Sequence, residues 1–141
     1  MREGLVAERA ARHRVLIVDD EESTRLLLAR IVSNDLEADV QLAGTSEQAL
    51  RLTRDYAYDA VLLDLLMPGP GGLAILKDIR SGPPNQATPV IIVSVVGDDR
   101  TIAECISAGA NVYHKKPVRR EALVQALREQ IAARRRAPAK S

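Results

Sequence analysis

Five short aliphatic runs, each followed by a segment whose apolar residues have helical spacing, constrain the fold of this chain more than any other feature. The runs lie at residues 15–18, 40–43, 59–64, 89–94 and 111–114. Each run is too short for a stable helix, and most are rich in β-branched residues, so each predicts a buried strand. Because their apolar residues are nearly continuous, the strands are typical of a parallel sheet that is covered on both faces.

The alternation of these five strands with five helical segments predicts an α/β fold, a doubly wound (βα)5 domain with a five-stranded parallel sheet. Parallel strands are joined by right-handed crossovers, which leaves few possible arrangements. We expect the flavodoxin-like strand order 2-1-3-4-5, in which the first and third strands lie side by side at the switch point of the topology.

Cap residues and apolar spacing predict where several helices begin and which faces they bury. Ser23 or Thr24 offers a cap for the first helix, and Thr45 with Gln48 makes a capping box for the second. Asp98 supplies negative charge at the start of the fourth. The spacing predicts buried faces formed by Leu27, Leu28, Ile31 and Val32 in the first helix and by Ile102, Cys105 and Ile106 in the fourth.

The composition fits one globular domain in a reducing compartment. The 141 residues are 46% apolar and include no Phe or Trp, so Leu, Ile, Val and Ala must build the core. The single cysteine, Cys105, excludes an internal disulfide. No apolar run approaches the roughly 20 residues needed to cross a bilayer, so we expect a cytoplasmic protein that does not contact a membrane.

Charge is distributed unevenly along the chain. Residues 1–14 carry four Arg against two Glu and residues 119–141 carry six Arg and one Lys against two Glu, which leaves residues 15–118 with a net charge of −6. A nucleic-acid-binding domain gathers positive charge on a folded face, so we expect no direct nucleic-acid binding. The acidic middle is compatible with a pocket that attracts a cation. We expect residues 1–13 to be a flexible lead-in, residues 14–133 to be the folded domain, and residues 134–141 to be a basic tail or the start of a linker.

Polar side chains stand at the ends of four of the five predicted strands. Asp19 and Asp20 follow the first strand, Asp64 ends the third, Ser94 ends the fourth, and Lys116 follows the fifth. The carboxyl ends of parallel strands meet at one edge of the sheet, so we expect these side chains to converge. Taken alone, Asp64 is better explained as a turn cap before Pro68 and the Pro/Gly-rich loop that follows it. The convergence makes it the expected chemical centre.

Such a cluster is suited to phosphoryl chemistry with a divalent cation. Carboxylates that lie a few ångströms apart repel one another, and an oxygen-rich site of this kind favours Mg²⁺. No Cys/His cluster accompanies it, which excludes a zinc site, and no GxxxxGK[ST] loop is present, which excludes a nucleotide-binding P-loop. An ionised Asp64 can attack an activated phosphoryl group, while Lys116 pairs with the phosphoryl oxygens and Ser94 donates a hydrogen bond to them.

This set of residues resembles the receiver (CheY-like) domain of a two-component response regulator, a phosphoacceptor module of bacterial signalling. The intervals of 44 residues from Asp20 to Asp64, 30 from there to Ser94 and 22 from there to Lys116 match the spacing of that family. The ordered set is far more specific than any one motif. The resemblance covers about residues 14–133 and rests on Asp19-Asp20, on Asp64 with Met67-Pro68 and Gly72, on Ser94, and on Lys116-Pro117.

The resemblance implies a role for each matching residue. Asp64 resembles the phosphoacceptor and Asp20 the direct Mg²⁺ ligand. Asp19 resembles the second acidic position, which acts through water, and Leu66 is expected to offer its backbone carbonyl to Mg²⁺. Lys116 resembles the lysine that pairs with the phosphoryl group.

The resemblance also implies a conformational switch. Ser94 resembles the hydroxyl that moves toward the phosphoryl group, and Tyr113 the aromatic side chain that then turns inward. This movement alters the face formed by the fourth helix, the fifth strand and the last helix. For Tyr113 the alternative is an ordinary, half-buried strand aromatic. The peptide bond between Lys116 and Pro117 is expected to be cis, which costs little before proline.

These likenesses imply a phosphorylatable switch rather than an enzyme that acts on a separate substrate. The expected phosphodonor is the phosphohistidine of a histidine kinase or phosphotransfer protein, and a homodimer through the same output face is implied by analogy. Neither the cognate kinase nor the output is identified by the sequence.

Two alternatives remain. A phosphatase of the haloacid-dehalogenase type needs D-x-D after its first strand, whereas Asp19 and Asp20 are adjacent. A receiver-like scaffold for dimerisation or docking, without phosphorylation, stays open because of Val95. The family usually has a small residue such as Ala at this position, and a bulkier side chain can narrow access to the phosphoryl group.

Overall fold

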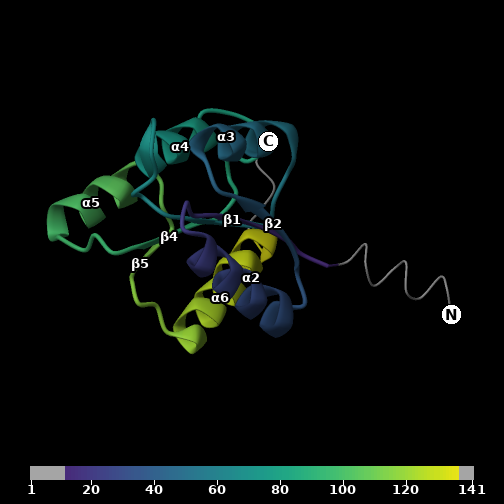
Figure 1. Ribbon diagram of the computed structural model, residues 1–141. Helices are drawn as coiled ribbons and strands as arrows, with labels where there is room; N and C mark the ends of the chain where they lie inside the picture. Colours follow the sequence, from purple (N-terminus) through teal and green to yellow (C-terminus); the bar gives the residue numbers. More distant parts are fainter. Residues whose placement is uncertain (1–11, 137–141) are drawn as a thin grey trace, which may run out of the picture.

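The computed structural model, which describes residues 12–136, alternates five parallel strands with five helices (Figure 1). The sheet has the order β2-β1-β3-β4-β5, so the predicted α/β class and the flavodoxin-like order 2-1-3-4-5 are confirmed. The strands are β1 (Arg14–Val18), β2 (Asp39–Ala43), β3 (Ala60–Leu63), β4 (Val90–Ser94) and β5 (Val112–Lys115). The helices are α2 (Glu22–Leu36), α3 (Ser46–Asp55), α4 (Gly71–Arg80), α5 (Asp99–Ser107) and α6 (Arg120–Arg136).

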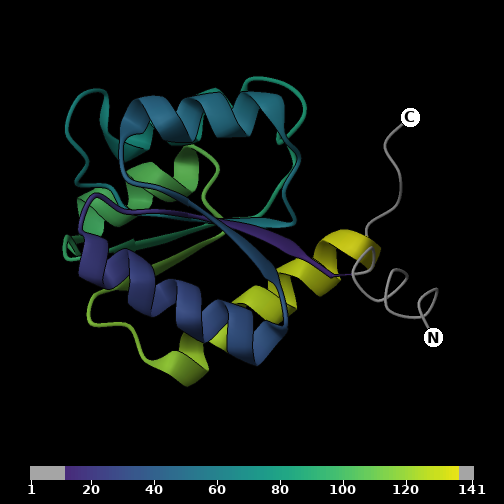
Figure 2. The same cartoon turned by 45° about the vertical axis from the view of Figure 1, so that its right-hand side comes forward.

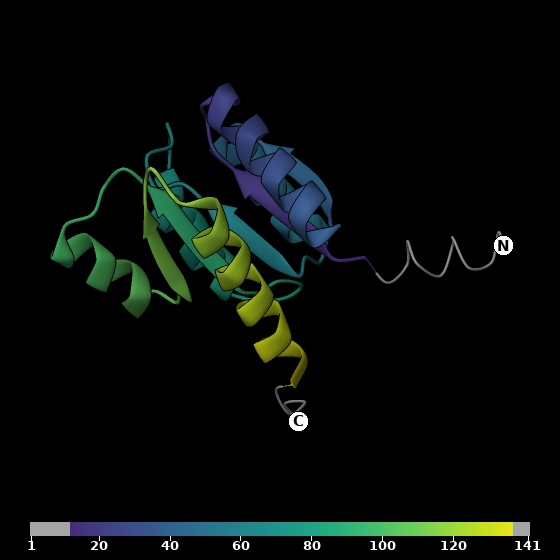
Figure 3. The same ribbon diagram turned by 90° about the horizontal axis from the view of Figure 1, so that it is seen from below.

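Helices cover both faces of the sheet, with α2 and α6 on one face and α3, α4 and α5 on the other (Figure 2, Figure 3). Side chains alternate between the two faces along each strand, so neighbouring strand residues enter different cores. The core under α2 and α6 includes Val15, Ile17, Leu28, Leu62, Leu123 and Leu127. The core under α3, α4 and α5 includes Leu16, Val18, Leu63, Leu76, Ile92 and Cys105.

The prediction that Ser23 or Thr24 caps α2 is wrong. The helix begins at Glu22 with Glu21 as the cap residue, and the hydroxyls of Ser23 and Thr24 donate to the Glu21 carboxylate instead of capping backbone groups. At α3 the predicted cap is confirmed, because the Thr45 hydroxyl accepts a hydrogen bond from the backbone N–H of Gln48 at 3.1 Å.

Two side chains that were predicted to be buried are exposed. Leu27 of α2 is 57% exposed and Ile106 of α5 is 47% exposed. The apolar stripe of each helix is wider than the face that meets the sheet, so Leu28 and Val32 are buried in α2, and Cys105 is the buried residue of α5. The surplus apolar side chains face outward.

The last helix runs to Arg136, so the expected start of a basic tail at residue 134 falls inside it. Arg134 donates hydrogen bonds from α6 to the Tyr58 carbonyl oxygen at 3.2 Å and to the Thr88 hydroxyl at 2.9 Å. The expected lead-in, except for residues 12 and 13, and residues 137–141 of the expected tail lie outside the described residues. Within residues 12–136 no helix is both long enough and apolar enough to cross a membrane.

Candidate functional site

The carboxyl edge of the sheet holds three carboxylates, as the sequence predicted. β1 and β3 are neighbours with Val18 paired to Leu63, so the residues that follow them, Asp19 and Asp64, lie side by side. Asp19 is 1% exposed and Asp64 is 5% exposed, whereas Asp20 is exposed. One carboxylate oxygen from each of the three residues lies within 4.8 Å of the other two.

Lys116 reaches this cluster from the end of β5. Its Nζ donates to the Asp19 carboxylate at 2.8 Å and to the Asp64 carboxylate at 3.1 Å. Burial alone would lower the pKa of Lys116, but its hydrogen bonds to Asp19 and Asp64 outweigh that effect and raise it. The ammonium therefore stays charged. The bond between Lys116 and Pro117 is cis, as predicted.

The cluster is chemically suited to a hard divalent cation. Three carboxylates face one ammonium group, which leaves an excess of negative charge at a partly buried position. Asp19 and Asp64 each accept one further hydrogen bond, from the backbone N–H groups of Glu21 at 2.9 Å and Leu66 at 3.2 Å. Donors made of oxygen alone fit Mg²⁺.

The loop after Asp64 needs a glycine for a reason that sequence reasoning did not find. The N–H of Gly72 donates to the Leu65 carbonyl at 3.0 Å, which folds the start of α4 back onto the end of β3. A Cβ atom at position 72 would lie 2.3 Å from the backbone oxygen of Asp64. Gly72 therefore permits a close backbone approach at Asp64, one of the two buried carboxylates of the cluster.

Two further residues support the carboxyl edge and were not singled out from the sequence. Arg25 of α2 donates from Nη1 to the backbone oxygen of Asp19 at 2.7 Å. Ser46, buried at the start of α3, donates to the Pro68 carbonyl at 2.9 Å and so holds the loop after Asp64. Neither carries a sequence signal of its own, because each acts on a backbone carbonyl that only the fold brings near.

Ser94 and Tyr113 both contact the loop between β4 and α5. Ser94 is fully buried, and its hydroxyl accepts a hydrogen bond from the Val96 N–H at 3.4 Å. The Tyr113 hydroxyl donates to the backbone oxygen of the same residue. Burial raises the pKa of Tyr113, so its hydroxyl keeps the proton that it donates. One loop residue thus joins the two side chains.

An apolar groove lies next to Lys116, between α2 and the loop that follows β5. It has a volume of about 370 Å³, and its lining includes Leu27, Val95 and Pro117. Leu27 and Val95 are each 57% exposed. The acidic edge therefore has an apolar surface beside it that is open to a partner.

The sequence matches the model of the family described as "Response regulator receiver domain" over residues 15–128. It is 36% identical over 126 residues to the response regulator GacA of Pseudomonas aeruginosa, a match that covers 86% of this chain and 56% of GacA. It is 37% identical over 109 residues to the sensory/regulatory protein RpfC of Xanthomonas campestris pv. campestris, covering 74% of this chain and 15% of RpfC. The chain thus spans about half of one relative and a small part of the other.

The fold is also found in solved receiver structures. The receiver domain of the sensor histidine kinase PA1611 from Pseudomonas aeruginosa PAO1 superposes with a TM-score of 0.79 at 25% identity, covering 86% of this chain and 99% of that one. That crystal structure has a magnesium ion coordinated in its active-site cleft. The family model spans all five strands and the polar residues at their carboxyl ends, so this chain belongs to the response regulator receiver domain family, a family of signalling modules.

Proposed function

We propose that this chain is a phosphorylatable switch in which Asp64 accepts a phosphoryl group from the phosphohistidine of a histidine kinase or phosphotransfer protein. The observation that carries the proposal is the contact of one lysine, Lys116, with two buried carboxylates at 2.8 and 3.1 Å. A structural ion pair is complete with one carboxylate. Here Lys116 contacts two, so an ionised Asp64 oxygen is held beside a fixed cation, which suits a nucleophile that attacks a phosphoryl group. The expected cytoplasmic location remains part of this proposal.

The transfer requires one bond to form and one to break. An Asp64 oxygen attacks phosphorus as the P–N bond to the donor histidine breaks, and the released imidazole nitrogen takes up a proton. Lys116 would pair with the phosphoryl oxygens, whose charge spreads during the transfer. Ser94 would offer its hydroxyl to the same oxygens. In this role the domain is not an enzyme with a separate substrate, although it assists its own phosphorylation and its own slow dephosphorylation.

The residues that would hold Mg²⁺ are Asp20, Asp64, the backbone carbonyl of Leu66 and, through water, Asp19. Their fit rests on oxygen ligands that gather within 4.8 Å and on the excess negative charge described above. A bound Mg²⁺ would neutralise the negative charge that the incoming phosphoryl group adds. Without it, Asp64 and the phosphoryl oxygens repel each other.

The signal would leave the site through the loop between β4 and α5. A phosphoryl group adds about −1.5 to −2 charge, which attracts the Ser94 hydroxyl. Ser94 accepts from the Val96 N–H, and Tyr113 donates to the Val96 carbonyl. Movement of Ser94 would therefore move Val96, to which the Tyr113 hydroxyl is also hydrogen-bonded. Tyr113 lies on the face formed by α5, β5 and α6. A homodimer through this face remains a prediction, as does the absence of nucleic-acid binding.

The apolar groove gives the phosphodonor a place to dock. A donor histidine must approach Asp64 from the carboxyl edge, so the donor protein covers the rim where Leu27 and Val95 are exposed. Burying such side chains supplies binding free energy at about 25 cal/mol per Å² of apolar surface. The groove thus supports a protein as donor in addition to a small phosphorylated molecule.

The first test is the intact mass of the protein after incubation with acetyl phosphate and Mg²⁺. We expect one added phosphoryl group on the wild type, none after chelation of Mg²⁺, and none on Asp64→Asn, which lacks the nucleophilic oxygen. Asp59→Asn, at the opposite edge of the sheet, serves as the matched control and should be labelled normally. A wild type that neither forms an adduct nor shifts its Tyr113 NMR signals with beryllofluoride would favour the scaffold alternative.

Val95→Ala tests whether this side chain narrows access to Asp64 or binds the donor. Because Val95 is exposed in the groove, we expect its truncation to leave labelling by acetyl phosphate unchanged and to slow transfer from a phosphorylated histidine phosphotransfer protein. Equal acceleration with both donors would instead support the narrowing role suggested by its bulk. Rapid-quench kinetics with each donor distinguish the two outcomes.

A further inference from the structure

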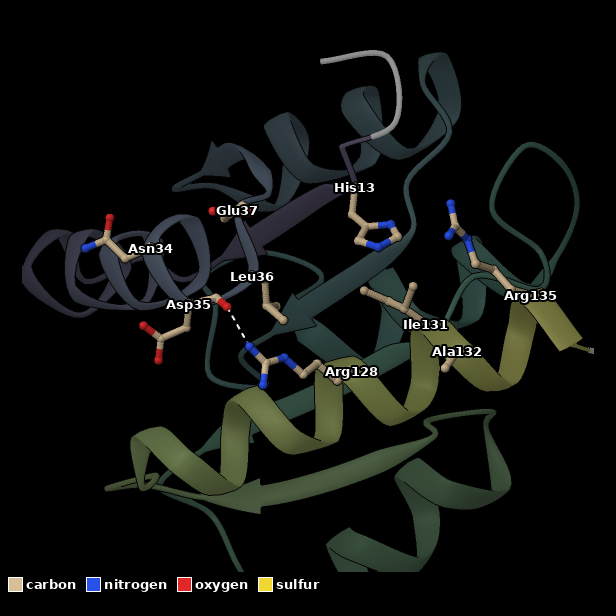
Figure 4. A pocket seen from close by; sticks show the side chains of 9 residues that line it. All are labelled: His13, Asn34, Asp35, Leu36, Glu37, Arg128, Ile131, Ala132 and Arg135. Atoms are coloured by element: carbon tan, nitrogen blue, oxygen red, sulfur yellow. Dashed lines mark hydrogen bonds between the residues drawn. The ribbon is translucent and has the colours of Figure 1, made fainter. Parts of the chain in front are cut away.

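A second cavity lies at the opposite edge of the sheet from Asp64 and has no part in the phosphoryl chemistry (Figure 4). It has a volume of about 530 Å³ and lies between the C-terminal end of α2, the C-terminal half of α6 and His13. His13 precedes β1 and Asp19 follows it, so the length of the strand separates the two sites. A partner bound here would leave the acidic edge accessible.

One face of α6 forms the floor and two of the charged sides of this cavity. Arg128, Ile131, Ala132 and Arg135 line it, and their spacing of three, four and seven positions places them along one side of the helix. Leu36 of α2 points into the space between the two helices (Figure 4). Ile131 is 5% exposed and forms the floor, and the partly exposed Leu36 and Ala132 form a short apolar strip beside it. An arginine stands at each end of this strip, and the helix backbone rises by about 10 Å from Arg128 to Arg135.

Neither of these two arginines is held in an ion pair within the described part of the chain. Neither Arg128 nor Arg135 forms an ion pair with any residue between 12 and 136. Arg128 donates a hydrogen bond to the backbone oxygen of Asp35 at 2.8 Å, and its charge also contributes to the lowered pKa of the Asp35 carboxyl. The carboxylate of Asp35 is held instead by Arg120, whose hydrogen bond lowers the pKa of Asp35.

The remaining sides of the cavity are a histidine and one unpaired acid. His13 has a buried Nδ1 without a hydrogen bond, 3.8 Å from the Asp59 carboxylate, and its ring lies above Ile131 in Figure 4. Glu37 stands exposed on the rim and has no ion-pair partner among the described residues. It is the side chain that would oppose an incoming carboxylate.

We propose that this groove binds an acidic amphipathic helix of a partner protein. Two carboxylates seven positions apart on that helix pair with Arg128 and Arg135, and the apolar residues between them pack on the partly exposed Leu36 and Ala132. This is the helix-in-groove mode of recognition, with apolar anchors at helical spacing and charges at the ends. A nucleic acid would satisfy the arginines but would leave the apolar strip without a partner.

The probe is a fluorescein-labelled, alanine-based helical peptide of about twenty residues, because isolated helices shorter than about 12–15 residues are marginal in water. It carries two Glu seven positions apart, with Leu three and four positions after the first Glu. Titration of the full chain, followed by fluorescence anisotropy, is expected to saturate. Arg128→Gln and Arg135→Gln should each weaken binding about three- to fivefold, the effect of losing one exposed ion pair. Glu37→Gln should strengthen it.

Arg100→Gln on α5 is the matched control, because Arg100 is also an exposed helical arginine and lies outside the cavity. Binding should be unchanged in this variant and lost with a peptide that carries Lys in place of both Glu.

The proposal fails if anisotropy does not saturate below about millimolar peptide, if both arginine variants bind like the wild type, or if a DNA duplex binds in an arginine-dependent manner where the peptide does not. Circular dichroism checks that the variants are folded, and acetyl phosphate labelling of Arg128→Gln and Arg135→Gln should stay normal whether or not the peptide binds.

Discussion

At the carboxyl edge, individual oxygen atoms of Asp19 and Asp64 have separate hydrogen-bond partners, and the backbone at Gly72 leaves no room for a side chain. Asp19 has one oxygen on the Lys116 ammonium and the other on the Glu21 N–H, so both are held in place. The Asp64 carboxylate contacts Lys116 and the Leu66 N–H in the same way. At Gly72 the backbone passes so near the Asp64 carbonyl that no side chain fits between them. A substitution at Asp19, Asp64 or Gly72 would therefore change the positions of the neighbouring groups as well as any charge.

Gly72→Ala should lower the free energy of unfolding by about 2–3 kcal/mol or displace the loop after Asp64, because its Cβ would lie 2.3 Å from a backbone oxygen. Gly82→Ala is the matched control. A Cβ at position 82 meets nothing within 4 Å, so this variant should be unchanged or more stable by about 0.5 kcal/mol. Urea denaturation measures both, and equal stabilities would contradict the role given to Gly72.

Helix α6 is tied to the rest of the fold by arginines at three levels. Arg120 holds the Asp35 carboxylate at the end of α2, Arg128 holds the Asp35 carbonyl, and Arg134 holds the loop between α4 and β4 through Thr88. By contrast, α5 buries only Cys105 among the residues of that helix. The switch proposed above therefore acts on the more loosely packed helix, while α6 keeps its position.

The pair of Asp35 with Arg120 makes stability depend on pH in a defined direction. The Arg120 hydrogen bond holds the pKa of Asp35 below its ordinary value of 3.8, so the pair contributes stability above that value and loses it as the pH falls through the lowered pKa. Asp35→Asn should therefore have a lower Tm than the wild type at neutral pH, and the difference should shrink as the pH falls below 3.8 and through the lowered pKa of Asp35. A difference that persists in Arg120→Gln would show that another contact of Asp35 is responsible.

At the scale of the whole molecule, the two cores and the two edges of the sheet have separate tasks. Both cores are built from aliphatic side chains that the strands supply alternately to each face. The carboxyl edge gathers acids and one lysine, whereas the second cavity at the opposite edge is lined by two arginines, two acids and a histidine. Apolar side chains that neither core uses, such as Leu27, face outward beside the acidic edge. A buried leucine therefore stabilises the core, whereas an exposed leucine such as Leu27 can contact a partner.

Leu62→Ala should lower stability, whereas Leu27→Ala should leave stability almost unchanged and slow phosphotransfer. Leu62 is 1% exposed, so its truncation leaves a cavity and should cost about 2–5 kcal/mol in unfolding free energy. Leu27 is 57% exposed, so its truncation should stay within about 0.5 kcal/mol. Leu27→Ala should nevertheless slow transfer from a histidine phosphotransfer protein while leaving acetyl phosphate labelling intact. A large loss of stability in Leu27→Ala would place this side chain in the core.

The fold could be predicted from the sequence because its main determinants are local. A short aliphatic run such as residues 15–18 is most stable as a strand that is buried on both faces. Five such strands that alternate with helices can be connected in only a few topologies. The convergence of Asp19, Asp64 and Lys116 could be predicted for the same reason, since parallel strands place their carboxyl ends together. Helix caps were less certain, because neighbouring polar side chains can bond to one another instead of to backbone groups, as Ser23 and Thr24 do with Glu21.

By itself, then, the sequence determined the strand order and the set of residues that meet at the acidic edge, because period and spacing act along the chain. Tertiary structure alone decided which surplus apolar residues face outward, why position 72 must be glycine, and that Arg25 and Ser46 support the site. It also decided that Arg128 and Arg135 flank a cavity with the end of α2. These features depend on distances between residues far apart in the chain, which arise only when the helices pack on the sheet.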